Sequence, residues 1–179
     1  MNMEAIILAG GFGKRLKEKS LDLPKPMVNI NDRPFLDYVF MHLNKYNIDK
    51  IILSVYYRGK IIEDYCNSSF NNINISYSVD KIPLGSGGAA KAAISKTINN
   101  NIFIINGDTV FDIDLKMLYD THLDQDNDIT LSLKPMRNFD RYGFAERDSD
   151  GRIIKFGEKK YQKFGLIDGG IYLIKNNIF

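Results

Sequence analysis

A short apolar run that leads directly into a glycine-rich loop opens the chain and limits the folds available to it. The stretch IILAGGFGKRL places Gly10–Gly11 at the end of the run and Gly13 two residues further on. Loops of this kind after a first strand expose backbone N–H groups that hold phosphate. The cations Lys14 and Arg15 follow at once and suit a polyphosphate ligand. We therefore expect an α/β protein whose first strand ends at a phosphate site.

Strand-like and helix-like segments alternate over the first two-thirds of the chain. Apolar runs predict strands at 5–9, 50–55, 73–79 and 101–107, and helices are expected at 34–47, 59–66, 88–97 and from Asp112 or Asp114 to His122. Further strands are expected at 128–136, 143–147, 151–157 and 166–174. This order favours a mostly parallel central sheet flanked by helices, with a small mixed strand region toward the C-terminus. Ligands of such sheets bind beyond the carboxyl ends of the strands, so the glycine loop and Asp108 should face one cleft.

The composition excludes several functional classes. A net charge of +2 gives no basic field for nucleic acid. The single cysteine, Cys66, excludes a disulfide framework and a cysteine-ligated metal, and we expect it to pack on a helix. The apolar run at 5–9 is too short for a signal peptide, and no segment has the length of a membrane span. We expect one cytoplasmic domain covering residues 1–179.

Two common phosphate-binding loops do not fit the opening stretch. The dinucleotide fingerprint requires a glycine three residues after Gly13, where Leu16 stands. The nucleoside-triphosphatase loop requires Ser or Thr where Arg15 stands and a first glycine where Leu8 stands. A loop of exposed N–H groups beside two cations remains, which is suited to triphosphate or pyrophosphate.

Two motifs together resemble the signature of the sugar-nucleotide pyrophosphorylases, also called sugar-1-phosphate nucleotidylyltransferases. These motifs are LAGGFGKRL and, a short distance on, LPKPMV at 23–28; the segments PLGSGGA, INGD, YGFAE, FGEKK and DGGIYLI extend the resemblance over the whole chain. Within the family, the sequence is most similar to the heptose 1-phosphate guanylyltransferases. The resemblance implies a Rossmann-like nucleotidyltransferase fold. It also implies a nucleoside triphosphate and a sugar 1-phosphate as partners, with no nucleic acid or membrane, and it leaves a homodimer open.

Two departures from the family pattern stand out. Most relatives have Thr or Ser where this chain has Lys14, which adds a cation near the phosphates. The family's second metal-binding aspartate normally lies beyond a strand like 166–174, whereas the sequence given stops at Phe179. We therefore expect the 1–179 domain to lack a C-terminal segment of the family.

The implied reaction is attack by a sugar 1-phosphate oxygen on the α-phosphorus of a nucleoside triphosphate, with pyrophosphate leaving. A sugar phosphate is largely dianionic at neutral pH, so the reaction needs no histidine base. The two histidines, His42 and His122, are expected to be packing or surface residues. Catalysis then depends on positioning and cations. The resemblance assigns Arg15 to the pyrophosphate, Lys25 to the α-phosphate, and Asp108 to Mg²⁺.

The remaining candidates divide between the two substrates. The nucleotide-binding candidates are Leu8, Ala9, Gly10, Gly11, Gly13, Lys14, Asp80, Pro83, Gly85 and Ser86. The sugar-phosphate candidates are Gly143, Glu158, Lys159 and Asp168. Relatives that read thymine or uracil often have glutamine three residues before the position of Pro83, where this chain has Asp80. A carboxylate only accepts hydrogen bonds, and guanine offers two adjacent donors, so Asp80 indicates guanine.

Two alternatives come from other classes. One alternative is a metal-dependent glycosyltransferase that uses a nucleotide-sugar. The Asp-x-Asp metal motif of that class occurs at 112–114 and again at 148–150. Asp112 and Asp114 also fit a helix cap. A non-catalytic nucleotide-sensing module could keep the glycines and lose Arg15, Lys25 or Asp108, but all three are present.

Overall fold

A computed structural model describes residues 3–11 and 23–179 of the chain. The strands are β1 Met3–Leu8, β2 Asn29–Ile30, β3 Arg33–Pro34, β4 Ile48–Val55, β5 Ile75–Val79, β6 Asn101–Asn106, β7 Ile129–Phe139, β8 Phe144–Arg147, β9 Ile153–Gly157 and β10 Gln162–Lys175. The helices are α1 Phe35–Leu43, α2 Gly59–Ser69, α3 Gly85–Ile94 and α4 Leu115–Asp124, and a 3₁₀ helix, η2, spans Lys25–Met27.

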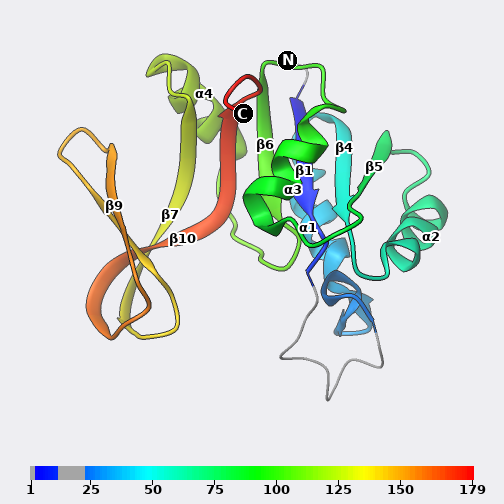
Figure 1. Ribbon diagram of the computed structural model, residues 1–179, viewed down its shortest axis with the longest axis horizontal. Helices are drawn as coiled ribbons and strands as arrows, with labels where there is room; N and C mark the ends of the chain where they lie inside the picture. The colour runs from blue at the N-terminus through cyan, green and yellow to red at the C-terminus, as the bar shows by residue number, and fades with distance from the viewer. Residues whose placement is uncertain (1–2, 12–22) are drawn as a thin grey trace.

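One eight-stranded sheet organises the molecule. Its order is β5-β4-β1-β6-β10-β8-β9, and β7 pairs with β10 off that path. Strands β5, β4, β1 and β6 are parallel, whereas β10 runs antiparallel to β6, β7 and β8. The expected fold, a mostly parallel sheet with a mixed region toward the C-terminus, is confirmed. In Figure 1 the strands of residues 133–168, here called the arm, extend to one side of the helix-covered part.

Strands β1 and β6 and the second half of β4 are buried on both faces because these stretches are mainly apolar runs, whereas the edge strand β5 has only one buried residue, Ser78. Ala5 and Ile7 of β1 face a core with side chains of α1, α2 and α4, while Ile6 faces the smaller core beneath α3. Alanine residues Ala90 and Ala93 form the buried face of α3, so this helix lies close to the sheet. Helices therefore pack on both faces of the sheet and position its strand ends.

Most predicted elements are present with shifted ends. Helix α3 begins at Gly85, three residues before the expected start, and α1 ends at Leu43. Asp114 is the N-cap of α4, and its carboxylate accepts from the backbone N–H groups of Lys116 and Met117. The β2–β3 hairpin and η2 were not expected. Within the described ranges, no helix is both long and apolar enough to span a membrane.

Strand β10 belongs to both parts of the sheet. Its first half pairs with β7 and β8, and residues 171–175 pair with β6. A bulge separates the halves after Asp168, and Gly170 adopts a φ of +77° there. A β-carbon at Gly169 would lie 2.2 Å from the Phe111 ring, so glycine is required for this close approach. The DGG sequence thus marks the point where the arm leaves the main sheet.

Candidate nucleotide-binding site

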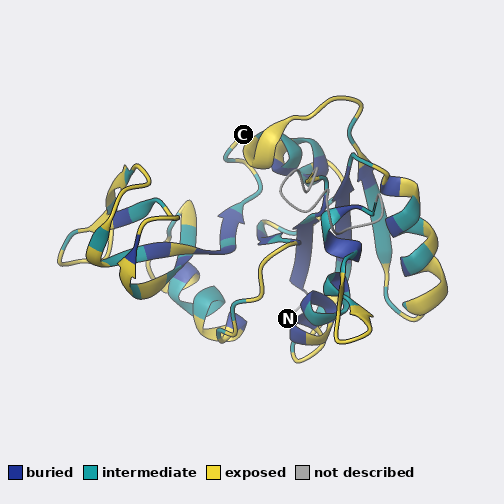
Figure 2. Ribbon diagram, turned by 90° about the horizontal axis from the view of Figure 1, so that it is seen from below, coloured by how far each residue is buried: buried dark blue, intermediate teal, exposed yellow. Residues whose placement is uncertain are grey.

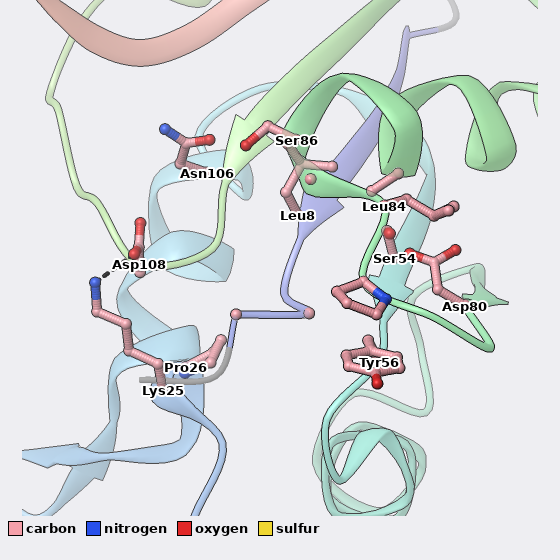
Figure 3. A pocket seen from close by; sticks show the side chains of 15 residues that line it. Leu8, Lys25, Pro26, Ser54, Tyr56, Asp80, Leu84, Ser86, Asn106 and Asp108 are labelled. Atoms are coloured by element: carbon pink, nitrogen blue, oxygen red, sulfur yellow. Dashed lines mark hydrogen bonds and ion pairs between the residues drawn. The ribbon is translucent and has the colours of Figure 1, made fainter. Parts of the chain in front are cut away.

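A cavity of about 330 Å³ lies at the carboxyl ends of β1, β4, β5 and β6. Its lining is made by Leu8, Gly10, Gly11, Lys25, Pro26, Ser54, Tyr56, Asp80, Pro83, Leu84, Gly85, Ser86, Ala89, Asn106 and Asp108. The glycine turn and Asp108 face one cavity, as the strand-end rule predicts. In Figure 3, Lys25 and Asp108 lie together on one side of the cavity, and Ser54, Tyr56 and Asp80 lie on the other.

The glycine turn connects the two ends of this cavity. Leu8 is the last residue of β1, and the N–H of Gly107 donates to its carbonyl at 3.0 Å. A β-carbon at Gly10 would lie 3.2 Å from the β-carbon of Tyr56, so the turn passes closely over the end of β4. Ala9 does not line the cavity: it is buried, and its N–H donates to the Ser54 carbonyl at 2.8 Å. At Gly10 and Gly11 the cavity wall is therefore formed by backbone.

Three candidates from the opening loop lie outside the described residues. These are Gly13, Lys14 and Arg15, and their expected contacts with the triphosphate stay predictions.

The phosphate end of the cavity holds a cation and a carboxylate from distant parts of the chain. Lys25 lies in η2 and Asp108 follows β6, and the Lys25 ammonium forms an ion pair with the Asp108 carboxylate. Pro24 and Pro26 flank the lysine, and Pro26 is buried, so the backbone that carries the ammonium is held firmly. Both side chains are 38% exposed, which leaves them accessible to a ligand. The pair therefore offers one positive and one negative group to phosphate and to a metal ion.

The opposite end of the cavity holds Asp80. Its backbone N–H donates to the Val55 carbonyl at 2.9 Å, which fixes it beside the end of β4. Burial raises the pKa of the Asp80 carboxyl above its ordinary value, because the charged form loses hydration. Such a carboxylate gains from a ligand that donates hydrogen bonds to it.

Helix α3 begins at the same end of the cavity. Gly85 and Ser86 are its first residues, and Gly85 has a φ of +69°, which favours glycine. No side chain from residues 3–11 or 23–179 caps this helix start. Because the first N–H groups of a helix have no partner within the helix, they can bind a ligand oxygen here.

The four sugar-phosphate candidates do not line this cavity. Glu158 and Lys159 lie exposed in the turn between β9 and β10, and Gly143 precedes β8. A β-carbon at Gly143 would lie 2.8 Å from the Gly157 carbonyl oxygen, so glycine permits close packing of β8 on β9. Asp168 accepts hydrogen bonds from the Gly170 N–H, at 2.7 Å, and from the Tyr172 hydroxyl. The structure thus assigns these residues to the arm, apart from the nucleotide end.

Sequence reasoning missed Ser54, Tyr56 and Asn106 in the cavity lining. Asn106 ends β6 directly before Gly107, and Ser54 is the next-to-last residue of β4. A polar residue at the carboxyl end of an apolar parallel strand was the available signal.

The Asp-x-Asp patterns have structural roles in this fold. Asp114 caps α4, and Asp112 pairs with Lys45 at 3.1 Å. The Asp148 carboxylate accepts from the N–H groups of Asp150 and Arg152 in the turn after β8. None of these carboxylates lines the cavity.

Both histidines pack inside the molecule, as expected. His122 of α4 contacts the Thr130 hydroxyl at 2.9 Å and the Asn101 side chain at 3.2 Å. His42 of α1 is buried, with Asp112 3.3 Å from its Nδ1. Burial is the main cause that lowers the pKa of each imidazole. Neither histidine lines the cavity.

The site lies at the carboxyl edge of a sheet that helices cover on both faces. It combines a glycine turn, the Lys25–Asp108 pair and the uncapped start of α3, and this combination is typical of an α/β protein that binds the phosphates of a nucleotide. The family model described as nucleotidyl transferase matches residues 4–179, and the chain belongs to that family. It is 49% identical over 178 residues to D-glycero-alpha-D-manno-heptose 1-phosphate guanylyltransferase of Aneurinibacillus thermoaerophilus, covering 99% of this chain and 76% of the relative. The Campylobacter jejuni enzyme of the same name is 48% identical over 177 residues, covering 99% and 78%.

Two solved structures are similar to this chain in fold and in sequence. HddC from Yersinia pseudotuberculosis has a TM-score of 0.89 and 34% sequence identity, covering 98% of this chain and 78% of that one. The structure of HddC complexed with GMP-PN has a TM-score of 0.88 with the same identity and coverage.

Proposed function

We propose that this chain is a guanylyltransferase that joins a heptose 1-phosphate to GTP, giving a GDP-heptose and pyrophosphate. One observation carries the proposal: a single cavity brings together the glycine turn, the Lys25–Asp108 pair and Asp80. Its phosphate end suits a triphosphate, and its far end suits a base with adjacent donors. The heptose guanylyltransferases at 48–49% identity support both substrates.

Lys25 is the residue that acts on the reacting phosphate. Its ammonium sits on a proline-flanked segment at the cavity edge, where it would hold an oxygen of the α-phosphate. Charge that builds up as the sugar phosphate oxygen attacks is stabilised by such a fixed cation. The attacking oxygen is already anionic, so no residue has to remove a proton. Arg15, which lies outside the described residues, would hold the departing pyrophosphate.

The carboxylate of Asp108 fits a Mg²⁺ ion that is held mainly by phosphate. Among the described residues, no group of three or more His, Cys, Asp or Glu side chains could hold a metal ion. Mg²⁺ commonly binds one or two carboxylates together with substrate phosphates and water, so a single exposed aspartate suffices from the protein side. Asp108 already pairs with one cation, Lys25, which supports a role for this carboxylate beside positive charge. When bound, the metal supplies charge neutralisation to the triphosphate.

Asp80 would read the base. Its carboxylate can accept from N1–H and from the N2 amino group of guanine at the same time. Uracil and thymine present one donor between two carbonyl oxygens, and those oxygens would repel the carboxylate. Adenine has one donor on this edge, its amino group, beside an acceptor nitrogen, so it also lacks two adjacent donors. Guanine is therefore the common base with the matching donor pair.

The arm would bind the acceptor. Lys159 would contact the sugar phosphate, Glu158 and Asp168 would accept from sugar hydroxyls, and Gly143 would allow close backbone approach. Lys159 is exposed in its turn, and Asp168 lies near the bulge where β10 joins the main sheet.

A substrate panel tests the proposal directly. The protein is incubated with Mg²⁺, each of the four nucleoside triphosphates, and heptose, mannose and glucose 1-phosphates. We expect pyrophosphate release and a GDP-heptose by mass spectrometry with GTP and the heptose 1-phosphate. Pyrophosphate release only with a pyrimidine triphosphate would contradict the guanine assignment. Turnover of a GDP-sugar without any triphosphate would favour a glycosyltransferase.

A further inference from the structure

The Ser54 hydroxyl is a buried polar group without a hydrogen-bond partner among the described residues. The residue is 1% exposed. Most buried hydroxyls in folded proteins have a partner, and an unpaired one costs free energy. Ser54 nevertheless lines the cavity, at the end that holds Asp80 (Figure 3). Its free hydrogen-bonding capacity therefore lies at the wall of a ligand site.

The register of the sheet explains why this hydroxyl faces the cavity. Leu8 of β1 pairs in register with Ser54 of β4 on one side and with Asn106 of β6 on the other. All three residues line the cavity. Side chains alternate along a strand, so Ser54 shares its face with Ile52, which packs beneath α3. The row thus forms the cavity floor where the cover of α3 ends.

Packing gives no reason for a hydroxyl at this position. Alanine would occupy nearly the same space without an unpaired polar atom, and the neighbouring floor position is the apolar Leu8. The hydroxyl is therefore better explained by a ligand than by the fold.

Asp80 limits what the hydroxyl can contact. The Asp80 N–H donates to the carbonyl of Val55, the residue after Ser54, so the two side chains stand at the same strand end. The carboxylate would take both guanine donors, at N1 and N2. The remaining group on that edge of the base is the O6 carbonyl, which needs a donor.

We propose that Ser54 is a specificity-determining residue whose hydroxyl donates to O6 of guanine. The inference rests on the proposed function, because it names a further contact of the same base. Together, Ser54 and Asp80 match the acceptor–donor–donor order of the guanine edge.

Base analogues separate the two contacts. GTP, 6-thio-GTP and ITP are compared as substrates with heptose 1-phosphate in wild type and in Ser54→Ala. Sulfur is a weak acceptor, so 6-thio-GTP lacks most of the O6 contact, whereas ITP lacks only the N2 amino group. We expect Ser54→Ala to lower kcat/KM for GTP about threefold to tenfold, the ratio that one net hydrogen bond corresponds to. The same variant should leave kcat/KM for 6-thio-GTP nearly unchanged and lower that for ITP as much as that for GTP.

Ser76→Ala is the matched control. The Ser76 hydroxyl also lacks a partner among the described residues, and Ser76 is paired in register with Ile52, but it does not line the cavity. It should leave all three substrates unaffected. Both variants should melt at or above the wild-type temperature, since each removes an unpaired buried hydroxyl.

Several outcomes would overturn the proposal. Equal losses for GTP and 6-thio-GTP in Ser54→Ala would show that the hydroxyl does not contact O6, as would an unchanged kcat/KM for GTP. A lower melting temperature together with equal losses on all substrates would show a packing role. If wild type does not use GTP at all, the proposed function fails instead, and a wild type that uses GTP separates the two failures.

Discussion

The helix-covered parallel half and the arm differ in how much of each strand is buried. In β1 and β6 nearly every residue is buried, whereas β8 and β9 together bury one, Ala145 (Figure 2). Large apolar side chains such as Ile154 and Phe156 of the arm are about two-thirds exposed, at 64% and 65%. The nucleotide cavity is built on the first half and the acceptor residues are assigned to the second.

On the proposed assignment of the acceptor to the arm, this difference corresponds to two modes of recognition. In the parallel half, strand ends that pack against helices on both faces form the described walls of the cavity. A thinly covered antiparallel arm has fewer buried contacts and adapts more readily to its ligand. We therefore expect substitutions in the cavity to act on nucleotide chemistry and substitutions in the arm to act on the acceptor.

Lys25→Ala is expected to have the largest effect on activity among the substitutions that test the division between the nucleotide half and the arm. Loss of a fixed charge-stabilising group should lower kcat by about a hundredfold to a thousandfold, as removal of one oxyanion donor does in other enzymes. Steady-state kinetics under saturating GTP and sugar phosphate measures it. Lys45→Ala, which removes a lysine paired with Asp112 outside the cavity, is the control. Similar losses in both variants would exclude a specific role for Lys25.

Asp108→Asn should change the metal dependence of the reaction. The half-saturating Mg²⁺ concentration should rise at least about tenfold, since even outer-shell partners of metal ligands are worth that much. A Mg²⁺ titration of activity at fixed GTP measures the shift, with Asp120→Asn on α4 as a surface control. An unchanged titration curve would move the metal site away from Asp108.

Asp80→Gln sharpens the comparison at the base. Replacing an acceptor-only group with one that also donates should lower kcat/KM for GTP by at least about tenfold, the value of a charge-assisted hydrogen bond. It should also narrow the preference for GTP over UTP or dTTP. Initial rates with GTP alone give its kcat/KM. Competition between the triphosphates, followed by product mass spectrometry, gives the preference for GTP over UTP or dTTP. A variant that keeps the full GTP preference would exclude Asp80 from the base site.

Lys159→Ala tests the arm. It should raise KM for the sugar 1-phosphate at least about tenfold and leave KM for GTP unchanged, because one charged hydrogen bond to the acceptor is lost. Lys160→Ala is a close control, since that ammonium lies 5.6 Å from the centre of the Phe144 ring instead. A change in KM for GTP of the same size would break the proposed division between the two halves.

The smallest expected effect concerns the junction of the two halves. His122 of α4 contacts Thr130 of β7 and Asn101 of β6, and burial lowers the pKa of its imidazole. The unfolded chain therefore binds a proton more readily, so the free energy of unfolding should fall as pH decreases from the ordinary histidine value of 6.5. Urea unfolding between about pH 5 and 8 measures the slope. His122→Gln should reduce the slope and leave the part that His42, whose pKa is also lowered by burial, contributes. An unchanged slope would assign it to groups other than His122.

The sequence predicts the parallel half well because its signals are local. The buried stretches of β1, β4 and β6 are apolar runs, and the strand-end rule places the glycine turn and Asp108 at one edge of the sheet. Lys25 follows no strand of this sheet, and the family resemblance was the signal that pointed to it. The two-residue strands of the β2–β3 hairpin are too short to show a period. Ser54 was missed because a single serine in an apolar run looks like part of the strand, and only the three-dimensional structure shows its missing partner.

Strand pairing in the arm was less predictable for another reason. The strands of the arm were expected, but the division of β10 between two sets of neighbours depends on long-range pairing. The contacts that fix it, such as the Ser132 hydroxyl donating to the Ile171 carbonyl at 2.9 Å across the bulge, join residues 39 apart. Alternation within a strand carries no information about such a partner.

The division of β10 at its DGG bulge has a practical consequence for protein engineering. The segment before the bulge pairs only with strands of the arm, and the segment after it pairs with β6 of the main sheet and with the first residues of β7. An exchange of the arm between related enzymes can therefore be cut within the strand, at Gly169 and Gly170, and on the other side near Ser132. Such a chimera would keep every described wall of the nucleotide cavity and receive a new acceptor surface. On the proposed assignment of the acceptor to the arm, this bulge is the point at which sugar specificity could be exchanged while the nucleotide half stays as it is.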